Sequence, residues 1–191
     1  MAKNSTYVSA LSPEYALLGL LEQGPTHGYD LHRRLSQDLG QVWHISQSQL
    51  YNILKRLEAQ GDITGEVQTH TRMPDRRILQ LTEQGRLRFE SWLATPTGCS
   101  VRALRVEFIT RLYFASARSR DQALGMIEDQ TAVLRQGLER LHSANNIYSA
   151  DKMHPAEQIF NHLGLEFRIQ QLRAALDWMQ SCAETIGRLD T

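Results

Sequence analysis

The sequence has few of the features that mark secreted, membrane or disulfide-stabilised proteins. It has only two cysteines, Cys99 and Cys182, far apart in a chain of 191 residues, which favours a reducing compartment over a disulfide framework. The uncharged run from Tyr15 to Leu21 is too short to cross a bilayer. No apolar segment follows the first residues, so no secretory signal is visible. We therefore expect a cytoplasmic protein that does not enter membranes.

An excess of charge of one sign is also missing. The chain has 21 basic and 21 acidic residues, with ten of each up to Leu93 and eleven of each after it. This balance excludes a basic tail and, taken alone, argues against a nucleic-acid binder. The apolar fraction of 41% and the charged fraction of 22% are ordinary for a globular chain of one large or two small domains.

Signatures of enzymes and metal sites are missing as well. The seven histidines form no HExxH or HxH pattern, and no CxxC is present. There is no phosphate-binding glycine loop and no GxSxG nucleophile motif. We therefore expect no enzyme, no catalytic residues, no bound metal and no cofactor.

Short helices with marked ends fill the first half of the chain. Thr26 is positioned to cap a second helix, and Ser46 with Gln49 forms a capping-box pattern for a third. The apolar residues of this third helix follow the spacing of one helix face; they are Leu50, Ile53, Leu54 and Leu57. Gly61 stands where a left-handed residue is needed to end the helix.

A change of period then predicts a β-hairpin. Apolar and polar residues alternate from Ile63 to Thr69, and Ile78–Leu81 is a second strand-like run. Residues 70–77 between them are polar and basic and include Pro-Asp, so we expect them to form the tip. Thr82 caps a further helix, and residues 95–98, Thr-Pro-Thr-Gly, mark a boundary between a domain of residues 1–95 and one of residues 96–191.

The second half is predicted to be helical, with two heptad seams. The first runs from Leu124 to Leu141. The second is the predicted dimerisation surface and consists of Leu165, Ile169, Leu172, Leu176, Met179 and Ile186. Two interpretations stay open at this point: the seams pack on each other within one chain, or the second seam packs on another copy.

This order of elements predicts a mostly α fold with a small β-hairpin wing: a winged helix-turn-helix domain followed by a helical dimerisation domain. In such a domain the third helix enters the major groove of DNA and the wing contacts the backbone or minor groove. The predicted contacts are Ser46, Gln47, Ser48, Gln49, Tyr51, Asn52, Lys55, Arg56, Arg72, Arg76 and Arg77. The alternatives are a merely solvated helix face and a winged-helix module that binds protein and not DNA.

Several motifs resemble the PadR family of bacterial transcriptional regulators, in its branch with a long C-terminal domain. They are residues 12–21 (SPEYALLGLL), 27–31 (HGYDL), 48–51 (SQLY), 54–58 (LKRLE) and 76–85 (RRILQLTEQG). The resemblance implies a homodimeric winged-helix regulator, often a repressor, which we expect to bind a pseudo-palindromic DNA operator. Gln49 and Asn52 stand where the family commonly has Gly and Pro, and Asp75 stands in a tip that is usually more basic or glycine-rich. These departures predict a different start of the third helix and different contacts to bases or phosphates.

The resemblance also suggests a small-molecule effector, because some relatives respond to phenolic or hydrophobic compounds. Aromatic residues that could line such a pocket are Trp43, Trp92, Phe108, Tyr113 and Trp178. The alternative is that these aromatics are simply core. With no net positive charge, the basic residues of the third helix and wing are a local feature, which predicts weak binding to random DNA and a selective binder.

Overall fold

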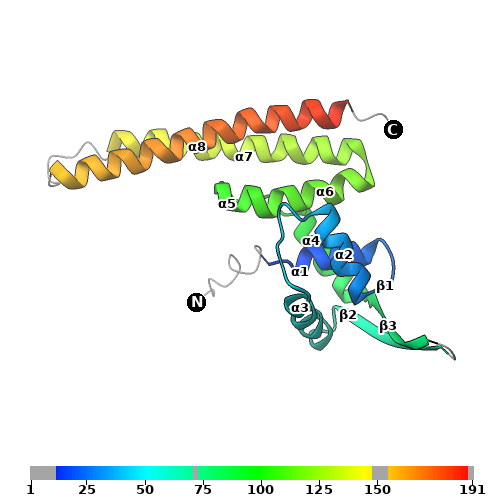
Figure 1. The fold of residues 1–191 in the computed structure, drawn as a ribbon. Helices are drawn as coiled ribbons and strands as arrows, with labels where there is room; N and C mark the ends of the chain where they lie inside the picture. The colour runs from blue at the N-terminus through cyan, green and yellow to red at the C-terminus, as the bar shows by residue number, and fades with distance from the viewer. Residues whose placement is uncertain (1–11, 71–72, 148–154, 189–191) are drawn as a thin grey trace. The chain divides into compact units, whose positions relative to one another are not determined.

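The computed structural model describes residues 12–70, 73–147 and 155–188 of the chain (Figure 1). These residues divide between Thr95 and Pro96 into two compact units. The predicted fold class is confirmed, since the chain is mostly helical and has one small sheet. No helix in the described ranges combines the length and the apolar character that crossing a membrane requires.

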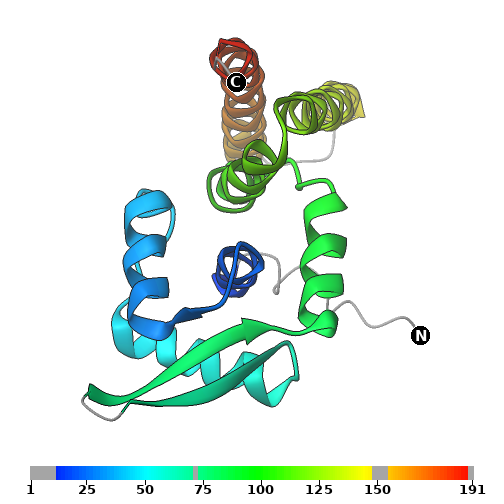
Figure 2. The same cartoon turned by 90° about the vertical axis from the view of Figure 1, so that its right-hand side faces the viewer.

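The N-terminal unit packs four helices and a small sheet. Its elements are α1 (Glu14–Glu22), β1 (Thr26–His27), α2 (Gly28–Asp38), α3 (Gln47–Ala59), β2 (Ile63–His70), β3 (Met73–Leu81) and α4 (Glu83–Ala94). Figure 2 shows α1 end-on in the middle of this unit, with the other elements around it. Ala16, Leu17, Leu18 and Leu20 of α1 have no exposed surface, so this short helix is the centre of the core.

The sheet has one strand more than the sequence predicts. It is antiparallel in the order β1-β3-β2. Thr26, predicted to cap the second helix, instead pairs with Leu79 of β3, and α2 begins after His27 with no side-chain cap. The prediction for Thr26 is wrong because two residues of strand pairing are too short to leave a period in the sequence.

Other predicted helix ends are confirmed. The Thr82 hydroxyl accepts a hydrogen bond from the Gly85 amide at 3.1 Å, which caps α4. Gly61 has φ +78° directly after α3, a conformation that few other residues adopt. These two ends fix where the sheet begins and stops.

A charge network built on two buried carboxylates joins four parts of this unit. Arg88 of α4 donates to Glu14 of α1 at 2.6 Å and pairs with Asp62, the residue before β2. Arg56 of α3 donates to the other oxygen of Glu14 at 2.5 Å. Burial alone would lower the pKa of Arg88, but hydrogen bonds to Asp62, Tyr15 and Glu14 raise it above its ordinary value. Arg88 therefore stays charged and holds two carboxylates that would otherwise be buried without adequate compensation.

The described residues of the C-terminal unit form helices and the short segments that join them. Its elements are α5 (Val101–Ala103), a π-helical turn η1 (Leu104–Phe108), α6 (Ile109–Arg118), α7 (Arg120–Ile147) and α8 (Pro155–Gly187). The long helices α7 and α8 run side by side in opposite directions (Figure 1). Their core contains Leu104, Phe108, Ile127, Leu134, Leu141, Leu172 and Met179.

A buried polar cluster anchors the first residues of this unit. The side-chain amide of Gln130 accepts from the Thr97 amide at 3.1 Å and donates to the Thr97 carbonyl at 3.0 Å. Arg111 donates to the Thr97 hydroxyl at 2.9 Å and to Glu107 at 2.5 Å. Desolvation raises the pKa of Glu107, and the charge of Arg111 opposes that rise. Thr97 is thus fixed to both α6 and α7.

The Arg88 network yields a stability prediction. Replacing Arg88 with Met keeps much of the side-chain volume but leaves Asp62 and Glu14 each with one cation fewer. We expect the free energy of unfolding to fall by about 3 kcal/mol, measured by urea denaturation of the full chain.

The matched control is Arg86→Met on the same helix. Arg86 pairs with Glu83 at the surface, where ion pairs contribute little to stability. We expect this variant to unfold close to wild type, and equal losses in the two variants would contradict the role given to Arg88.

Candidate DNA-binding interface

Helix α3 begins at the predicted capping box and buries the predicted face. The Ser46 hydroxyl accepts from the Gln49 amide at 3.2 Å, and the Gln49 side chain accepts from the Ser46 amide at 2.8 Å. Both side chains therefore hold the start of the helix, although both were also predicted to contact DNA. The four apolar residues of the predicted face are buried, so the other face of the helix is available to a ligand.

The exposed face of α3 carries most of the remaining predicted contacts. Gln47, Ser48, Tyr51, Asn52 and Lys55 are all exposed. Their amides, hydroxyls and ammonium group can bind phosphates or base edges.

Arg56 differs from these residues because its guanidinium is committed to Glu14 of α1. Half of its side chain is still exposed, but its charge serves first to join α3 to α1. Sequence reasoning missed this partner because it lies 42 residues away.

The wing is longer than predicted, and its arginines lie in different places. Residues 70–77 were expected to form the tip, but β2 runs to His70 and β3 starts at Met73. Arg77 therefore belongs to a strand, where it pairs with Val67. Arg76 pairs with Gln68 through the backbone, and its side chain is outside the described set, as is the whole of Arg72. The tip prediction is wrong for Arg77 because the ladder continues through polar residues.

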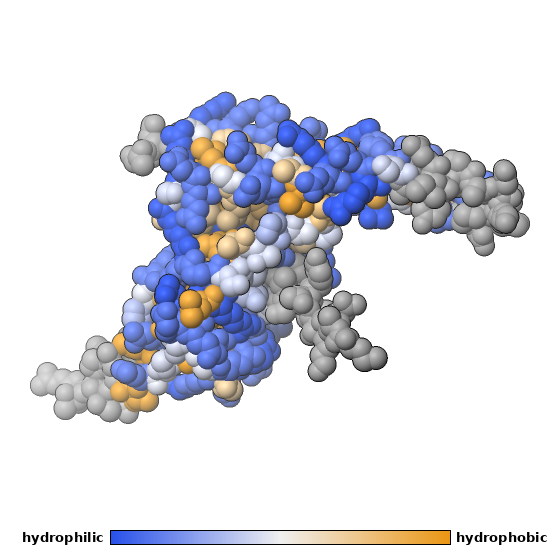
Figure 3. Space-filling view, turned by 180° about the vertical axis from the view of Figure 1, so that it is seen from behind, coloured by the Kyte–Doolittle hydropathy of each residue, from blue (hydrophilic) through white to orange (hydrophobic). Residues whose placement is uncertain are grey.

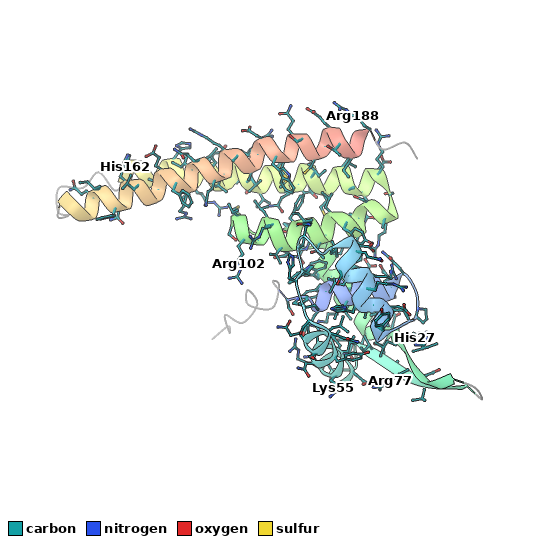
Figure 4. All side chains as sticks on the ribbon, viewed as in Figure 1. His27, Lys55, Arg77, Arg102, His162 and Arg188 are labelled. Atoms are coloured by element: carbon teal, nitrogen blue, oxygen red, sulfur yellow. The ribbon has the colours of Figure 1, made fainter. Side chains whose placement is uncertain are left out.

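A pocket of about 510 Å³ lies beside α3 and the base of the wing. Its lining residues are His27, Gly28, Tyr29, Asp30, Tyr51, Leu54, Lys55, Glu58, Arg77 and Leu79. Figure 4 shows His27, Lys55 and Arg77 at the same end of the N-terminal unit. The start of α2, the exposed face of α3 and strand β3 thus meet at one concave surface.

Sequence reasoning missed three members of this surface. Tyr29, near the start of α2, is 61% exposed. His27 contacts the Arg77 carbonyl through Nδ1 at 3.1 Å, and Glu58 forms an ion pair with Arg77. A signal for Glu58 is present in the sequence, because it follows Tyr51 by seven positions and Lys55 by three, which places all three on one helix face.

The predicted effector residues are divided between the two units. Trp92 is buried and stacks on Tyr15 with ring centroids 4.7 Å apart, while Trp43 borders a small pocket between α2 and α3. The other three belong to the C-terminal unit, as described next.

Within the C-terminal unit the predicted aromatics form two separate ring contacts. Phe108 is buried and Trp178 is 38% exposed. Their rings pack edge to face with centroids 6.0 Å apart. Tyr113 contacts Phe114 with centroids 5.0 Å apart.

The six residues predicted for dimerisation pack within the chain. Leu172 and Met179 are buried in the core of the C-terminal unit, and the other four are partly buried against it. A second copy is therefore not needed to cover this seam.

Comparison with known proteins covers both units. Residues 17–91 match the model of the transcriptional regulator PadR-like family, and residues 104–187 match that of the virulence activator alpha C-terminal region. A negative transcriptional regulator PadR of Bacillus subtilis is 28% identical over 178 residues, which cover 92% of this chain and 97% of that protein. A probable transcriptional regulator of Mycobacterium tuberculosis is 23% identical, with 91% of this chain and 96% of that protein covered.

Among solved structures, a crystal structure of Bacillus subtilis PadR in complex with operator DNA has a TM-score of 0.42 and 27% identity, with 91% of this chain and 98% of that chain covered. Another structure of that protein, in complex with p-coumaric acid, has a TM-score of 0.39 and 28% identity, with coverage of 92% and 99%. The match of the N-terminal unit to the family model and the nearly full-length similarity to a curated regulator agree with the motifs in the sequence. The N-terminal unit belongs to the PadR-like family of transcriptional regulators.

Proposed function

We propose that this regulator binds a pseudo-palindromic DNA operator as a homodimer and represses transcription. We also propose that it is located in the cytoplasm. The observation that carries the proposal is the exposed polar face of α3, where Tyr51 and Lys55 line one pocket with Arg77 of the wing. A helix of this kind can read base edges while the adjoining strand contacts the backbone. Repression is supported by the Bacillus subtilis relative, which is a negative transcriptional regulator.

The electrostatics of the interface favour selective binding. Arg56 and Arg77 are both paired with carboxylates of the same chain, so much of the local positive charge is already neutralised. Binding that depends on phosphate charge alone is then weak, and contacts specific to one sequence must supply more of the affinity.

The test is a binding-site selection followed by titration of the selected operator and of a random duplex. We expect the affinity for the operator to fall steeply between about 50 and 200 mM salt, because binding releases counterions. Lys55→Ala lowers the salt slope on both duplexes by about one unit. Tyr51→Ala weakens binding to the operator several-fold more than binding to random DNA, because the loss of a base contact affects only the matching sequence.

The control is Arg102→Ala, at an exposed residue of α5 outside the interface. We expect wild-type binding from this variant. A chain that selects no sequence and shows no salt dependence would reject the operator and leave the winged-helix module that binds protein as the alternative.

The homodimer is supported by an exposed apolar stripe on α8. Ile159, Phe160, Leu163 and Phe167 are 58%, 73%, 52% and 60% exposed. At 3.6 residues per turn they fall within about 100° of arc, on the side opposite the buried seam. The face in Figure 3 is mostly hydrophilic with small hydrophobic areas, and a stripe of large apolar side chains is unusual for a monomer. A second copy would bury it by two-fold symmetry.

For the dimer, we expect Phe160→Glu combined with Phe167→Glu to give a monomer of 21.8 kDa in sedimentation equilibrium. The fold should survive because both side chains are exposed, and like charges would then face each other across the interface. Arg168→Glu, also exposed on α8 but outside the stripe, should remain dimeric. Dimers from both variants would exclude the stripe as the interface.

We extend the proposal to control by a small aromatic molecule. What supports it is the half-exposed Trp178, whose ring contacts the buried Phe108. With p-coumaric acid as the probe, we expect the affinity for the operator to fall about tenfold, within the usual range of coupling between sites. Trp178→Ala should abolish this response and Trp43→Ala should preserve it. An unchanged affinity in wild type would reject this effector.

A further inference from the structure

Arg77 is held in one orientation by residues on both sides of it. Its guanidinium forms an ion pair with Glu58 of α3, and its backbone carbonyl contacts His27. The side chain crosses strand β2 at Gly65, where an added Cβ would lie only 2.4 Å from Nε. The absence of a side chain at Gly65 therefore lets the arginine pass over the strand toward α3.

The position of Glu58 is not explained by the needs of its own helix. It is the penultimate residue of α3 (Gln47–Ala59), and an acid near a helix C-terminus is disfavoured by the helix dipole. It also lines the proposed DNA-facing pocket together with Tyr51 and Lys55, where a negative charge repels phosphates. An acid at such a place costs both helix stability and general DNA affinity, so its explanation lies in its partner.

From this geometry we propose that Glu58 is a positioning and selectivity residue for DNA, acting through Arg77; the proposal rests on the operator binding proposed above. The ion pair persists in the operator complex. It keeps the guanidinium of Arg77 beside α3. The guanidinium N–H groups that do not bond to Glu58 can then donate to an acceptor of the bound operator DNA. On random DNA, where the phosphates do not lie beside α3 in the same way, the ion pair with Glu58 prevents Arg77 from binding them.

Two consequences distinguish this role from others. Glu58 tightens binding to the operator, because Arg77 is ordered before DNA arrives. It also weakens binding to random DNA, because the charge of Arg77 is neutralised there. The two effects have opposite signs on the two duplexes, so together they raise the specificity ratio, which is the quantity that matters among many competing sites.

The test is Glu58→Gln in the full chain, titrated with the selected operator and a random duplex of equal length. We expect about threefold weaker binding to the operator and about threefold tighter binding to random DNA, so that the specificity ratio falls about tenfold. The salt slope on random DNA should steepen by about one unit as Arg77 gains a phosphate. The melting temperature should not fall, because the substitution also relieves the unfavourable helix-terminal charge.

Two further variants separate the role of Arg77 from simpler effects. Glu83→Gln removes an equally arginine-paired acid on α4 that does not line the pocket, and we expect it to bind both duplexes as wild type does. In an Arg77→Ala background, Glu58→Gln should change neither affinity by more than about twofold, because its partner is gone.

Several results would overturn the proposal. If Glu58→Gln tightens binding to both duplexes equally, or acts as strongly without Arg77, Glu58 contributes only bulk charge. If it matches Glu83→Gln, or only lowers the melting temperature, the pair has no part in selecting DNA. A wild-type chain that binds neither duplex rejects the proposed function before any variant is compared, whereas a selective wild type with an unchanged ratio in Glu58→Gln rejects this inference alone.

Discussion

The N-terminal unit depends on the neutralisation of one buried carboxylate, that of Glu14, by two arginines. Glu14 is only 5% exposed. It lies at the start of α1, where the helix dipole already favours a negative charge. One oxygen accepts from Arg56 of α3 and the other from Arg88 of α4. Because α1 is the centre of the core, this single group ties the proposed recognition helix to the rest of the unit. A shift of α1 would change where α3 presents its exposed face.

The same pairing explains how a neutral chain can carry a DNA-binding face. Arg56, Arg77 and Arg88 each have a carboxylate partner within the N-terminal unit. The acids that cancel the net charge are therefore not spread at random over the surface, and several of them orient the arginines. A chain built in this way has little long-range attraction for nucleic acid, and its contacts depend on position more than on total charge.

The sequence predicted local features well and long-range ones poorly. The capping box of Ser46 and Gln49, the cap at Thr82 and the left-handed Gly61 are set by residues within a few positions, so their patterns are legible. The pair of Glu58 with Arg77 joins residues 19 positions apart and that of Glu14 with Arg56 joins residues 42 apart. The periodicity of apolar residues does not predict which acid pairs with which arginine. The seam of α8 was likewise visible, but its spacing alone does not distinguish α7 of the same chain from a second copy.

The anchoring of Thr97 sets the length of the connection between the two units. Helix α4 ends at Ala94, and the amide of Gln130 pairs with the Thr97 backbone in the way that a neighbouring strand would. Only Thr95 and Pro96 are left between these fixed points, so three Cα–Cα steps, at most about 11 Å when extended, join Ala94 to Thr97. Proline further restricts the backbone of such a segment. A residue inserted or deleted between Ala94 and Thr97 would therefore have to be accommodated at these two positions or at the expense of the hydrogen bonds between Thr97 and Gln130.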